Sequence, residues 1–355
     1  MESGSRVLVL GTGQMGAGIA RHVLATPGLE LVGVYGKRRE RSGLDVGRAI
    51  GLGRDLGLTI ETDLTSLATR TKPDVAIQAT CSRLEDAWPE IETLLRHGIS
   101  VVSIAEEMAY PSCSSPTIAA AMDDLARTHR AAVIGTGINP DFVLDLLVIL
   151  LTGVCLSIDS ITATRVNDLS RYGPTVLRAQ GVGMTPDGFK AGAKAGTVRG
   201  HIGFAESISM IAAALGLSID SIEQTVEPIV SDIRRETSFI TVEPGCVAGT
   251  RHTAIAYRQG KPFITLDHPQ QVRPKLAGVE TGDLIEIDGT PNLRLTGNPE
   301  IPGGVGTIAI AVNMIPRVLA AAPGYHSMAD LPVPVALLGG VGLGTELSDR
   351  RGRHA

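Results

Sequence analysis

The stretch Val7-Leu-Val-Leu-Gly-Thr-Gly-Gln-Met-Gly16, continued by Ala17-Gly-Ile-Ala20, decides the fold class. Its four apolar residues predict a buried strand, and a Gly-x-Gly-x-x-Gly turn then leads into residues suited to a helix. This order of strand, glycine turn and helix is the context in which the motif binds a dinucleotide. A structural glycine turn in an unrelated α/β protein is the alternative. Because a matching βαβ pattern follows, we predict a dinucleotide site.

Each glycine of the turn has a predicted role. Gly11 allows the tight turn out of the strand, Gly13 lets the backbone approach a pyrophosphate, and Gly16 lets the helix pack against the strand. The free N–H groups at the start of the helix then hold the phosphates. The predicted cofactor contacts come from the whole turn: Gly11, Thr12, Gly13, Gln14, Met15 and Gly16.

The end of the second predicted strand, residues 29–35, bears on which cofactor is used. NAD sites usually place an acid there to bind the ribose 2′-hydroxyl. This chain has Tyr35-Gly-Lys-Arg-Arg39 instead, with no acid until Glu40. A solvated basic loop is the alternative, but Lys37 and Arg38 suit a 2′-phosphate. We therefore expect NADP as the preferred cofactor, with NAD also possible.

Two further predicted strands end in candidate cofactor contacts. The strand at residues 74–80 ends in Ala79 and Thr80, which we expect along the nicotinamide ribose, because ligands of such sheets bind at the carboxyl ends of the strands. The strand at residues 131–134 leads to Asn139 and Pro140. Asn139 could cap a helix that begins at Pro140, bind the nicotinamide carboxamide, or do both.

The pattern along the chain predicts two domains. Residues 1–155 form an α/β Rossmann NAD(P)-binding domain, completed by a C-terminal helix at about 303–335. Residues 156–302 form an α+β substrate-binding and dimerisation domain with an open mixed or antiparallel sheet. Its predicted strands alternate apolar and polar residues and are separated by turns. They lie at residues 158–166, 238–242, 253–258, 262–267, 283–287 and 292–296.

Two adjacent glutamates are the candidate catalytic groups. Glu106 and Glu107 follow the predicted strand at residues 99–105, where the ligand crevice of a dinucleotide domain opens. A carboxylate beside the nicotinamide could take a proton from an ammonium substrate or protonate a leaving oxygen. The alternative is a helix N-terminal charge or a surface ion pair, and strand alternation lets only one of the two face the crevice. We expect hydride transfer in a cleft between the two domains.

Further candidates lie in the second domain. His201 lies between two glycines and could titrate near neutral pH, or be structural. Tyr172 lies in a loop that could cover the cleft, although a packed tyrosine is equally compatible. A carboxylate-bearing substrate would need an arginine. The candidates are Arg165, Arg171, Arg178 and Arg199.

Composition excludes several classes of protein. The net charge is −5 over 355 residues and the basic residues are scattered, so we expect no nucleic-acid binding. No apolar run reaches the length of a membrane span, and no signal-peptide pattern precedes the first strand, so we expect a cytoplasmic protein without a membrane partner. The cysteines lack metal-ligand spacing. They are expected to be free thiols: Cys81, Cys113, Cys155 and Cys246.

Several motifs together resemble the 2,4-diaminopentanoate dehydrogenases and the native amine dehydrogenases grouped with them, distant relatives of dihydrodipicolinate reductase. The most specific are Glu106-Glu-Met-Ala-Tyr-Pro111 and Gly200-His-Ile-Gly-Phe204. The resemblance also rests on the glycine turn and on residues 43–47, 135–140, 165–168 and 181–183. Dihydrodipicolinate reductase activity itself is not expected, because the His-His-x-x-Lys and Ser-Gly-Thr motifs of that enzyme are missing.

The resemblance implies an NAD(P)-dependent oxidoreductase that acts on CH–NH2 donors. It would reversibly deaminate an amine to a ketone or aldehyde and ammonia, with a 2,4-diaminopentanoate-like molecule as one possible substrate. The catalytic glutamate of the family maps onto the Glu106–Glu107 pair, with Glu106 favoured. The resemblance also places Tyr172 and His201 in the substrate pocket, to which we add Phe142.

Two alternatives remain open at this point. One is an NADP-dependent imine or carbonyl reductase that does not use free ammonia, and the other is a non-catalytic NADP-binding sensor. Turnover of an amine dehydrogenase depends on ammonium, whereas turnover of an imine or carbonyl reductase does not. Replacing Glu106 and Glu107 abolishes turnover in an enzyme, whereas a sensor has no turnover to lose. The open sheet of the second domain predicts a homodimer.

Overall fold

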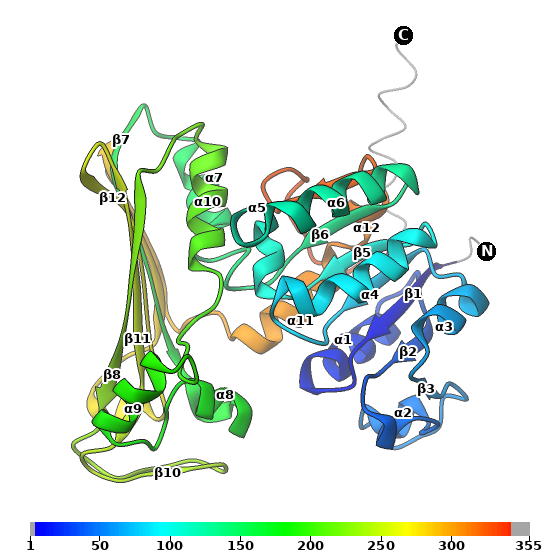
Figure 1. Cartoon of the computed structure of the whole chain (residues 1–355), viewed down its shortest axis with the longest axis horizontal. Coiled ribbons are helices and arrows are strands. Elements are labelled where there is room, and N and C mark those ends of the chain that lie inside the picture. The colour runs from blue at the N-terminus through cyan, green and yellow to red at the C-terminus, as the bar shows by residue number, and fades with distance from the viewer. Residues whose placement is uncertain (1–3, 342–355) are drawn as a thin grey trace. The chain divides into compact units, whose positions relative to one another are not determined.

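The computed structural model describes residues 4–341. The chain divides into two compact units, one made of residues 4–141 with 303–341 and the other of residues 142–302 (Figure 1). The first unit is therefore discontinuous in sequence, since it is completed by chain that follows the second.

The first unit contains a parallel sheet of seven strands in the order β15-β6-β5-β4-β1-β2-β3. Its central strands are continuous apolar runs because helices cover both faces of the sheet. Val7, Leu8, Val9 and Leu10 of β1 are fully buried. The strands are β1 (Ser5–Leu10), β2 (Leu29–Tyr35), β3 (Ile60–Glu61), β4 (Val75–Gln78), β5 (Ser100–Ser103), β6 (Ala132–Gly135) and β15 (Gly324–His326).

Two helical layers enclose this sheet. In one layer α4 packs against both α3 and α6, and in the other α11 packs against both α1 and α12 (Figure 1). The helices are α1 (Gln14–Ala25), α2 (Val46–Ala49), α3 (Leu64–Thr71), α4 (Leu84–Arg96), α5 (Pro111–Ser114), α6 (Pro116–Thr128), α11 (Gly303–Asn313) and α12 (Ile315–Leu319). Short 3-10 turns are η1 (Arg39–Arg41) and η2 (Glu106–Ala109).

The second unit contains a mixed sheet of six strands in the order β14-β13-β7-β12-β11-β8. Its only parallel pair is β7 with β12, and the other neighbours are antiparallel. The strands are β7 (Ser157–Asp168), β8 (Ser221–Val230), β11 (Val247–Arg258), β12 (Lys261–Gln271), β13 (Gly282–Thr290) and β14 (Leu293–Gly297). A separate small ribbon pairs β9 (Arg235–Glu236) with β10 (Thr241–Val242).

Short helices accompany this second sheet. Helix α10 packs on α7 and β11, and α9 packs on β8. The helices are α7 (Leu146–Thr152), α8 (Pro174–Ala179), α9 (Pro186–Lys194) and α10 (Phe204–Ala214), with 3-10 turns η3 (Leu169–Arg171) and η4 (Pro274–Ala277). The predicted fold class, a Rossmann domain with an α+β domain, is confirmed.

Three local predictions were wrong. Strand β8 was missed because it is a polar edge strand that contains Pro228, and a proline in a run of residues argues against a regular strand. The strand predicted at residues 238–242 shrinks to β10. No helix begins at Pro140. Helix α7 begins at Leu146, and the Asp145 side chain caps it, so Asn139 is not a helix cap.

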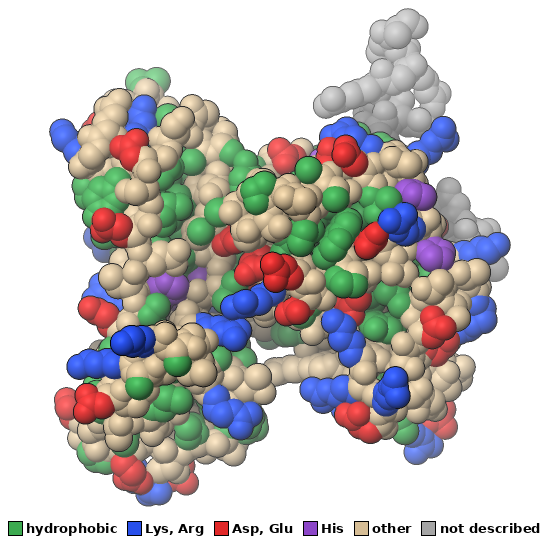
Figure 2. All heavy atoms as spheres, viewed as in Figure 1, with side chains coloured by type: hydrophobic (Ala, Val, Ile, Leu, Met, Phe, Trp, Pro, Cys, Tyr) green, Lys and Arg blue, Asp and Glu red, His purple; other side chains and the backbone are tan. Residues whose placement is uncertain are grey.

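Charged side chains of both signs are scattered over the surface drawn in Figure 2. On the face drawn in Figure 2, Lys and Arg side chains alternate with Asp and Glu instead of gathering in one patch. Among residues 4–341, every helix is too short or too polar to cross a membrane.

Candidate active site

The glycine turn has the geometry that a dinucleotide requires. A Cβ on Gly11 would lie 2.5 Å from the Ala79 carbonyl oxygen, and one on Gly16 would lie 2.1 Å from the Gly11 carbonyl oxygen. Both positions therefore admit only glycine. Gly13 differs, because no heavy atom of residues 4–341 lies within 4 Å of its added Cβ. The turn is tight on its inner side and open at Gly13, which fits a pyrophosphate at the start of α1.

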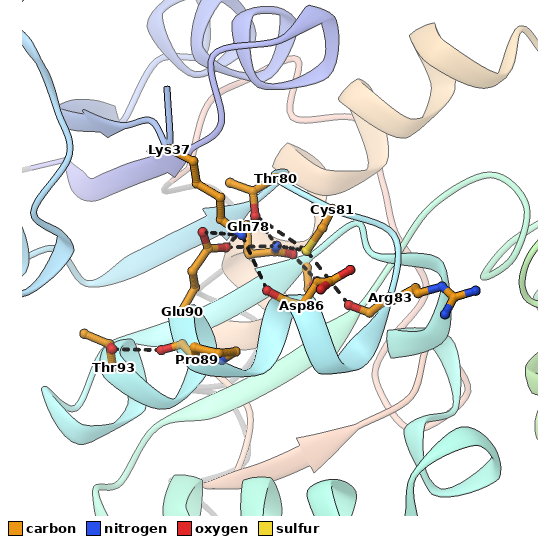
Figure 3. Close-up of polar contacts among 10 residues, drawn as sticks. Lys37, Gln78, Thr80, Cys81, Arg83, Asp86, Pro89, Glu90 and Thr93 are labelled. Carbon is orange, nitrogen blue, oxygen red and sulfur yellow. Dashed lines mark hydrogen bonds and ion pairs between the residues drawn. The ribbon is translucent and has the colours of Figure 1, made fainter. Parts of the chain in front are cut away.

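The cations after β2 differ in their surroundings. Lys37 Nζ lies 3.1 Å from Glu90 Oε1, so its charge is already paired (Figure 3). Arg38 is exposed. The Arg41 guanidinium donates a hydrogen bond to the carbonyl of Thr12, inside the glycine turn. Sequence reasoning missed Arg41, although it is the last cation of the same basic run.

The carboxyl end of β4 lies beside the glycine turn. The Ala79 N–H donates to the Leu10 carbonyl at 2.8 Å, which fixes residue 79 next to Gly11. The Thr80 hydroxyl instead turns inward and donates to Glu90 Oε2. Thr80 therefore belongs to a buried polar network, and Ala79 offers backbone atoms at the predicted cofactor position.

The two candidate glutamates have different surroundings. Glu107 Oε2 accepts a hydrogen bond of 2.8 Å from the N–H of Leu84, so it occupies the N-terminus of α4. Glu106 begins the turn η2, and the Ser82 hydroxyl donates to its carboxylate. Burial raises the pKa of Glu106 above its usual value of 4.5, and the neighbouring charge of Glu107 raises it further, against the hydrogen bonds that lower it. A half-buried carboxyl whose pKa is raised by desolvation suits a proton-transfer group.

A tyrosine from the C-terminal segment holds the turn η2. The Tyr325 hydroxyl is 2.9 Å from the Ala109 carbonyl oxygen and 3.2 Å from the Met108 carbonyl oxygen. Burial raises the pKa of Tyr325 well above its usual value, so the hydroxyl stays protonated and can donate. Tyr325 therefore fixes the backbone that carries Glu106.

Asn139 lies in the loop that follows β6. Both polar atoms of its side-chain amide are buried without a hydrogen-bond partner among residues 4–341. Leaving a buried amide unpaired is unfavourable by about 1–3 kcal/mol. A ligand amide that supplied both a donor and an acceptor would remove this penalty, which fits the predicted nicotinamide carboxamide.

Three histidines meet in the second unit, and we call them the histidine cluster: His201, His252 and His268. The rings of His201 and His268 lie 5.3 Å apart. His252 Nδ1 accepts a hydrogen bond of 3.0 Å from the backbone N–H of His201, so this nitrogen carries no proton. His268 Nδ1 lies 2.6 Å from the Arg165 carbonyl oxygen and must donate to it.

The histidine cluster is neutral at physiological pH. Burial lowers the pKa of His252 to about 4 and that of His268 to about 3. Burial and the neighbouring His268 lower the pKa of His201 well below its usual value. The expectation that His201 titrates near neutral pH is therefore wrong. Its Nε2 is buried without a hydrogen-bond partner among the described residues, so it is available to a ligand.

The candidate residue Tyr172 lies beside Asn167 and Arg165. It is half-buried, packs on the apolar cluster around Leu169, and accepts a hydrogen bond from the Asn167 side chain. Burial raises its pKa, so the hydroxyl stays protonated. Asn167 Oδ1 is another buried atom without a hydrogen-bond partner in the described chain. Sequence reasoning missed Asn167.

Of the four candidate arginines, only Arg165 is buried. Its guanidinium contacts Asp283 Oδ1 and the Ile301 carbonyl. The exposed candidates are Arg171, Arg178 and Arg199. Phe142 is half-buried at the start of the second unit, where its carbonyl accepts a hydrogen bond from Leu147. Among the described residues, no group of three or more acidic, histidine or cysteine side chains could hold a metal ion.

Comparison with known proteins identifies the family. The family model for the 2,4-diaminopentanoate dehydrogenase C-terminal domain matches residues 142–345. The model for the N-terminus of dihydrodipicolinate reductase matches residues 5–104. The chain belongs to the 2,4-diaminopentanoate dehydrogenase family. The resemblance stated from the sequence motifs is thereby confirmed, and the chain is an oxidoreductase that acts on amine donors.

Individual relatives match along nearly the whole chain. A 2,4-diaminopentanoate dehydrogenase from Acetoanaerobium sticklandii is 43% identical over 336 residues, which cover 94% of this chain and 95% of that protein. An amine dehydrogenase from Streptomyces virginiae is 26% identical over 93% of this chain and 97% of its own length. The solved structure of an amine dehydrogenase from Mycobacterium smegmatis has a TM-score of 0.84 at 29% identity, covering 94% and 98% of the two chains.

Proposed function

We propose that the chain catalyses the reversible oxidative deamination of a small amine, with NADP as the preferred cofactor and NAD also used. The observation that carries the proposal is the half-buried Glu106, whose carboxyl has a pKa raised by desolvation, at the carboxyl end of β5 in a dinucleotide-binding sheet. The reaction converts an amine, water and the oxidised cofactor into a ketone or aldehyde, ammonia, the reduced cofactor and one proton.

Glu106 manages the protons of this reaction. The bound nicotinamide would accept or supply the hydride. In the deaminating direction, the Glu106 carboxylate takes a proton from the substrate ammonium, so that the free amine can lose hydride from its carbon. Water then adds to the resulting iminium carbon and ammonia leaves. In the aminating direction the same carboxyl protonates the hydroxyl that leaves as water.

The cofactor residues form two groups on the first unit. The glycine turn, residues 11–16, would bind the pyrophosphate, and Asn139 would bind the nicotinamide carboxamide. Arg38 and Arg41 would meet the adenosine 2′-phosphate, because one is exposed after β2 and the other contacts the glycine turn. Two guanidinium groups, neither of them in an ion pair among the described residues, favour a phosphate over a hydroxyl, which is the basis for preferring NADP.

The substrate residues lie in the second unit. His201 Nε2 and Asn167 Oδ1 are buried atoms that still need hydrogen-bond partners, and an amino or ammonium group can supply donors to both. Tyr172 lies beside Asn167, and its protonated hydroxyl would donate a hydrogen bond to a substrate carboxylate, whereas the buried Arg165 is already paired with Asp283. We therefore propose a short amino acid with a second amine as the substrate, of the kind that the name 2,4-diaminopentanoate dehydrogenase describes for the relative from Acetoanaerobium sticklandii.

The decisive experiment is NADPH oxidation with a panel of small ketones, including 2-amino-4-oxopentanoate, with and without ammonium. We expect turnover only when ammonium is present. Equal consumption of a ketone without ammonium would instead support a carbonyl reductase. NADPH binding without turnover on any ketone, amine or diamine would support a sensor.

The open sheet of the second unit supports a homodimer as the assembly. Its edge strands β14 and β8 and its half-buried face are compatible with a symmetric contact between two copies. Light scattering coupled to size exclusion at micromolar concentration should give twice the mass of one chain. A monomer mass across the whole concentration range would contradict this prediction.

A further inference from the structure

An acidic residue does lie at the end of β2, but α4 supplies it. Proteins of this fold that use NAD usually carry an acid there within the strand sequence itself. In this chain that place is taken by Lys37, and Glu90 approaches it from helix α4 (Figure 3). Glu90 Oε1 lies 3.1 Å from Lys37 Nζ, and the ammonium also lies 3.5 Å from the carbonyl oxygen of Asp86 on the same helix.

The surroundings of Glu90 fix its carboxylate in this position. The Glu90 side chain is only 6% exposed, whereas that of Lys37 is 47% exposed. The second carboxylate oxygen of Glu90, Oε2, accepts hydrogen bonds from the Gln78 amide at 3.2 Å and from the Thr80 hydroxyl. Gln78 is in turn held by the Ser103 hydroxyl at 2.6 Å. A carboxylate bound on several sides has little freedom to swing away from the lysine.

We infer that Glu90 is a cofactor-selectivity residue, which acts by neutralising Lys37 so that the chain accepts NAD as well as NADP. The inference rests on the proposed function, since it assumes that the adenosine ribose lies at the end of β2. The pair presents almost no net charge to the 2′ position. Only Arg38 and Arg41 then favour NADP through its 2′-phosphate, and no uncompensated charge of the Lys37–Glu90 pair opposes the binding of NAD.

The reason is electrostatic. A buried carboxylate is stable only when it is paired with a cation, and Lys37 is the cation that pairs with Glu90. The carboxylate in turn neutralises the charge of the lysine. Removing the carboxylate would leave an uncompensated ammonium near the 2′-phosphate and strengthen the binding of NADPH. Removing the ammonium would leave an uncompensated carboxylate and weaken that binding. Removing both would restore a neutral pair, so the selectivity of the double variant should return to that of the natural chain.

The test is a double-mutant cycle of Glu90→Gln and Lys37→Gln in the full chain. The measurement is the ratio of the dissociation constants of NADH and NADPH, from the fluorescence of the bound nucleotides without substrate and at fixed ionic strength. We expect Glu90→Gln to shift the ratio about tenfold towards NADPH, and Lys37→Gln to shift it about tenfold the other way. The ratio measured for the double variant should lie within about twofold of the ratio for the natural chain.

Two results would overturn the inference. An unchanged ratio in Glu90→Gln would mean that the pair has only a structural role. A double variant that stays as weak towards NADPH as Lys37→Gln would mean that Lys37 binds the phosphate independently of Glu90. If Glu90→Gln does not fold, the comparison of Lys37→Gln with the double variant still tests the inference. These two chains differ only at residue 90, so the double variant should return the NADH/NADPH ratio of dissociation constants to that of the natural chain.

Glu92→Gln is the matched control, because Glu92 lies on the same helix and pairs with Arg96 on its solvent side. This variant should leave the ratio unchanged. Ammonium-dependent turnover is measured in parallel to separate the two proposals. An unchanged ratio in a chain that still aminates ketones refutes the selectivity role alone. A natural chain that binds neither nucleotide refutes both the proposed function and this inference.

Discussion

Glu106 and Glu107 are neighbours in sequence, but the fold gives them separate roles. Glu107 accepts the first N–H of α4, a bond that glutamine can also accept. Glu106 is half-buried and held by Ser82, and it is the proposed proton-transfer group. We therefore expect Glu106→Gln to lower kcat about 10³-fold, within the range of general acid–base catalysis, while Glu107→Gln retains most of the activity. Steady-state kinetics in the aminating direction checks both variants.

The same pair predicts a shift in pH dependence. Glu106 must be ionised to accept a proton in deamination, so activity should fall as the pH drops through its raised pKa. Because the charge of Glu107 contributes to raising that pKa, Glu107→Gln should move the acidic limb of the kcat/KM profile to lower pH. An acidic limb that does not move would show that another group controls this limb.

At the scale of the element, the glycine turn provides a matched pair of substitutions. Gly16→Ala forces a Cβ against the Gly11 carbonyl oxygen and should disturb the start of α1, lowering both stability and cofactor binding. Gly13→Ala places its methyl group in open space, so the thermal unfolding temperature should change by only a few degrees. We nevertheless expect it to weaken NADPH binding at least tenfold, because the pyrophosphate must approach that backbone. Unfolding curves and nucleotide titrations of both variants provide the test.

The histidine cluster makes the second unit sensitive to acid. Its members have lower pKa values in the folded chain than the ordinary 6.5, so the unfolded chain binds more protons as the pH falls below 6.5. Stability should therefore be lost from about pH 6.5 downwards, until the pH reaches the folded values of about 4 for His252 and about 3 for His268. At pH 5 the loss is about 2 kcal/mol for each of these two histidines.

Urea unfolding at several pH values measures this dependence. His252→Gln should flatten the slope of stability against pH between 6.5 and 5, although it also lowers stability at neutral pH. His97→Gln serves as the comparison, because His97 is exposed at the end of α4. An equal effect of both substitutions on the slope would contradict the assignment to the cluster.

The elements built from local patterns were predictable, and the contacts that cross the fold were not. Strand β1, the glycine turn and α1 follow from apolar runs and glycine spacing within some twenty residues. Glu90, Arg41 and Tyr325 could not be recognised in this way, because each acquires its role from a partner on another element. Tyr325 acts on a turn that lies more than two hundred residues earlier. The low pKa of His201 comes first from its burial in the fold and then from His268 and His252, which β12 and β11 bring near it, and neither cause is visible in the local sequence.

At the scale of the whole molecule, the first unit cannot be separated from the end of the chain. Ile310, Val312, Ile315 and Val318 of α11 and α12 are buried, and a Cβ on Gly18 of α1 would lie 2.2 Å from Ile308. A chain ending at residue 302 would expose this apolar surface of the sheet and lose β15. We expect such a truncated chain to be insoluble or rapidly proteolysed and not to bind NADPH. Limited proteolysis alongside the full chain checks the prediction.

The position of β15 also governs the order in which the protein can be made. During translation, the whole second unit emerges from the ribosome before the strand that completes the first. The β6 edge of the nascent Rossmann sheet and the side later covered by α11 therefore stay unprotected at least until the second unit, residues 142–302, has been added. Tyr325 follows the second unit in the chain, and its hydroxyl fixes the turn that carries Glu106. The proposed proton-transfer group can therefore reach its final position only after the whole second unit has been synthesised.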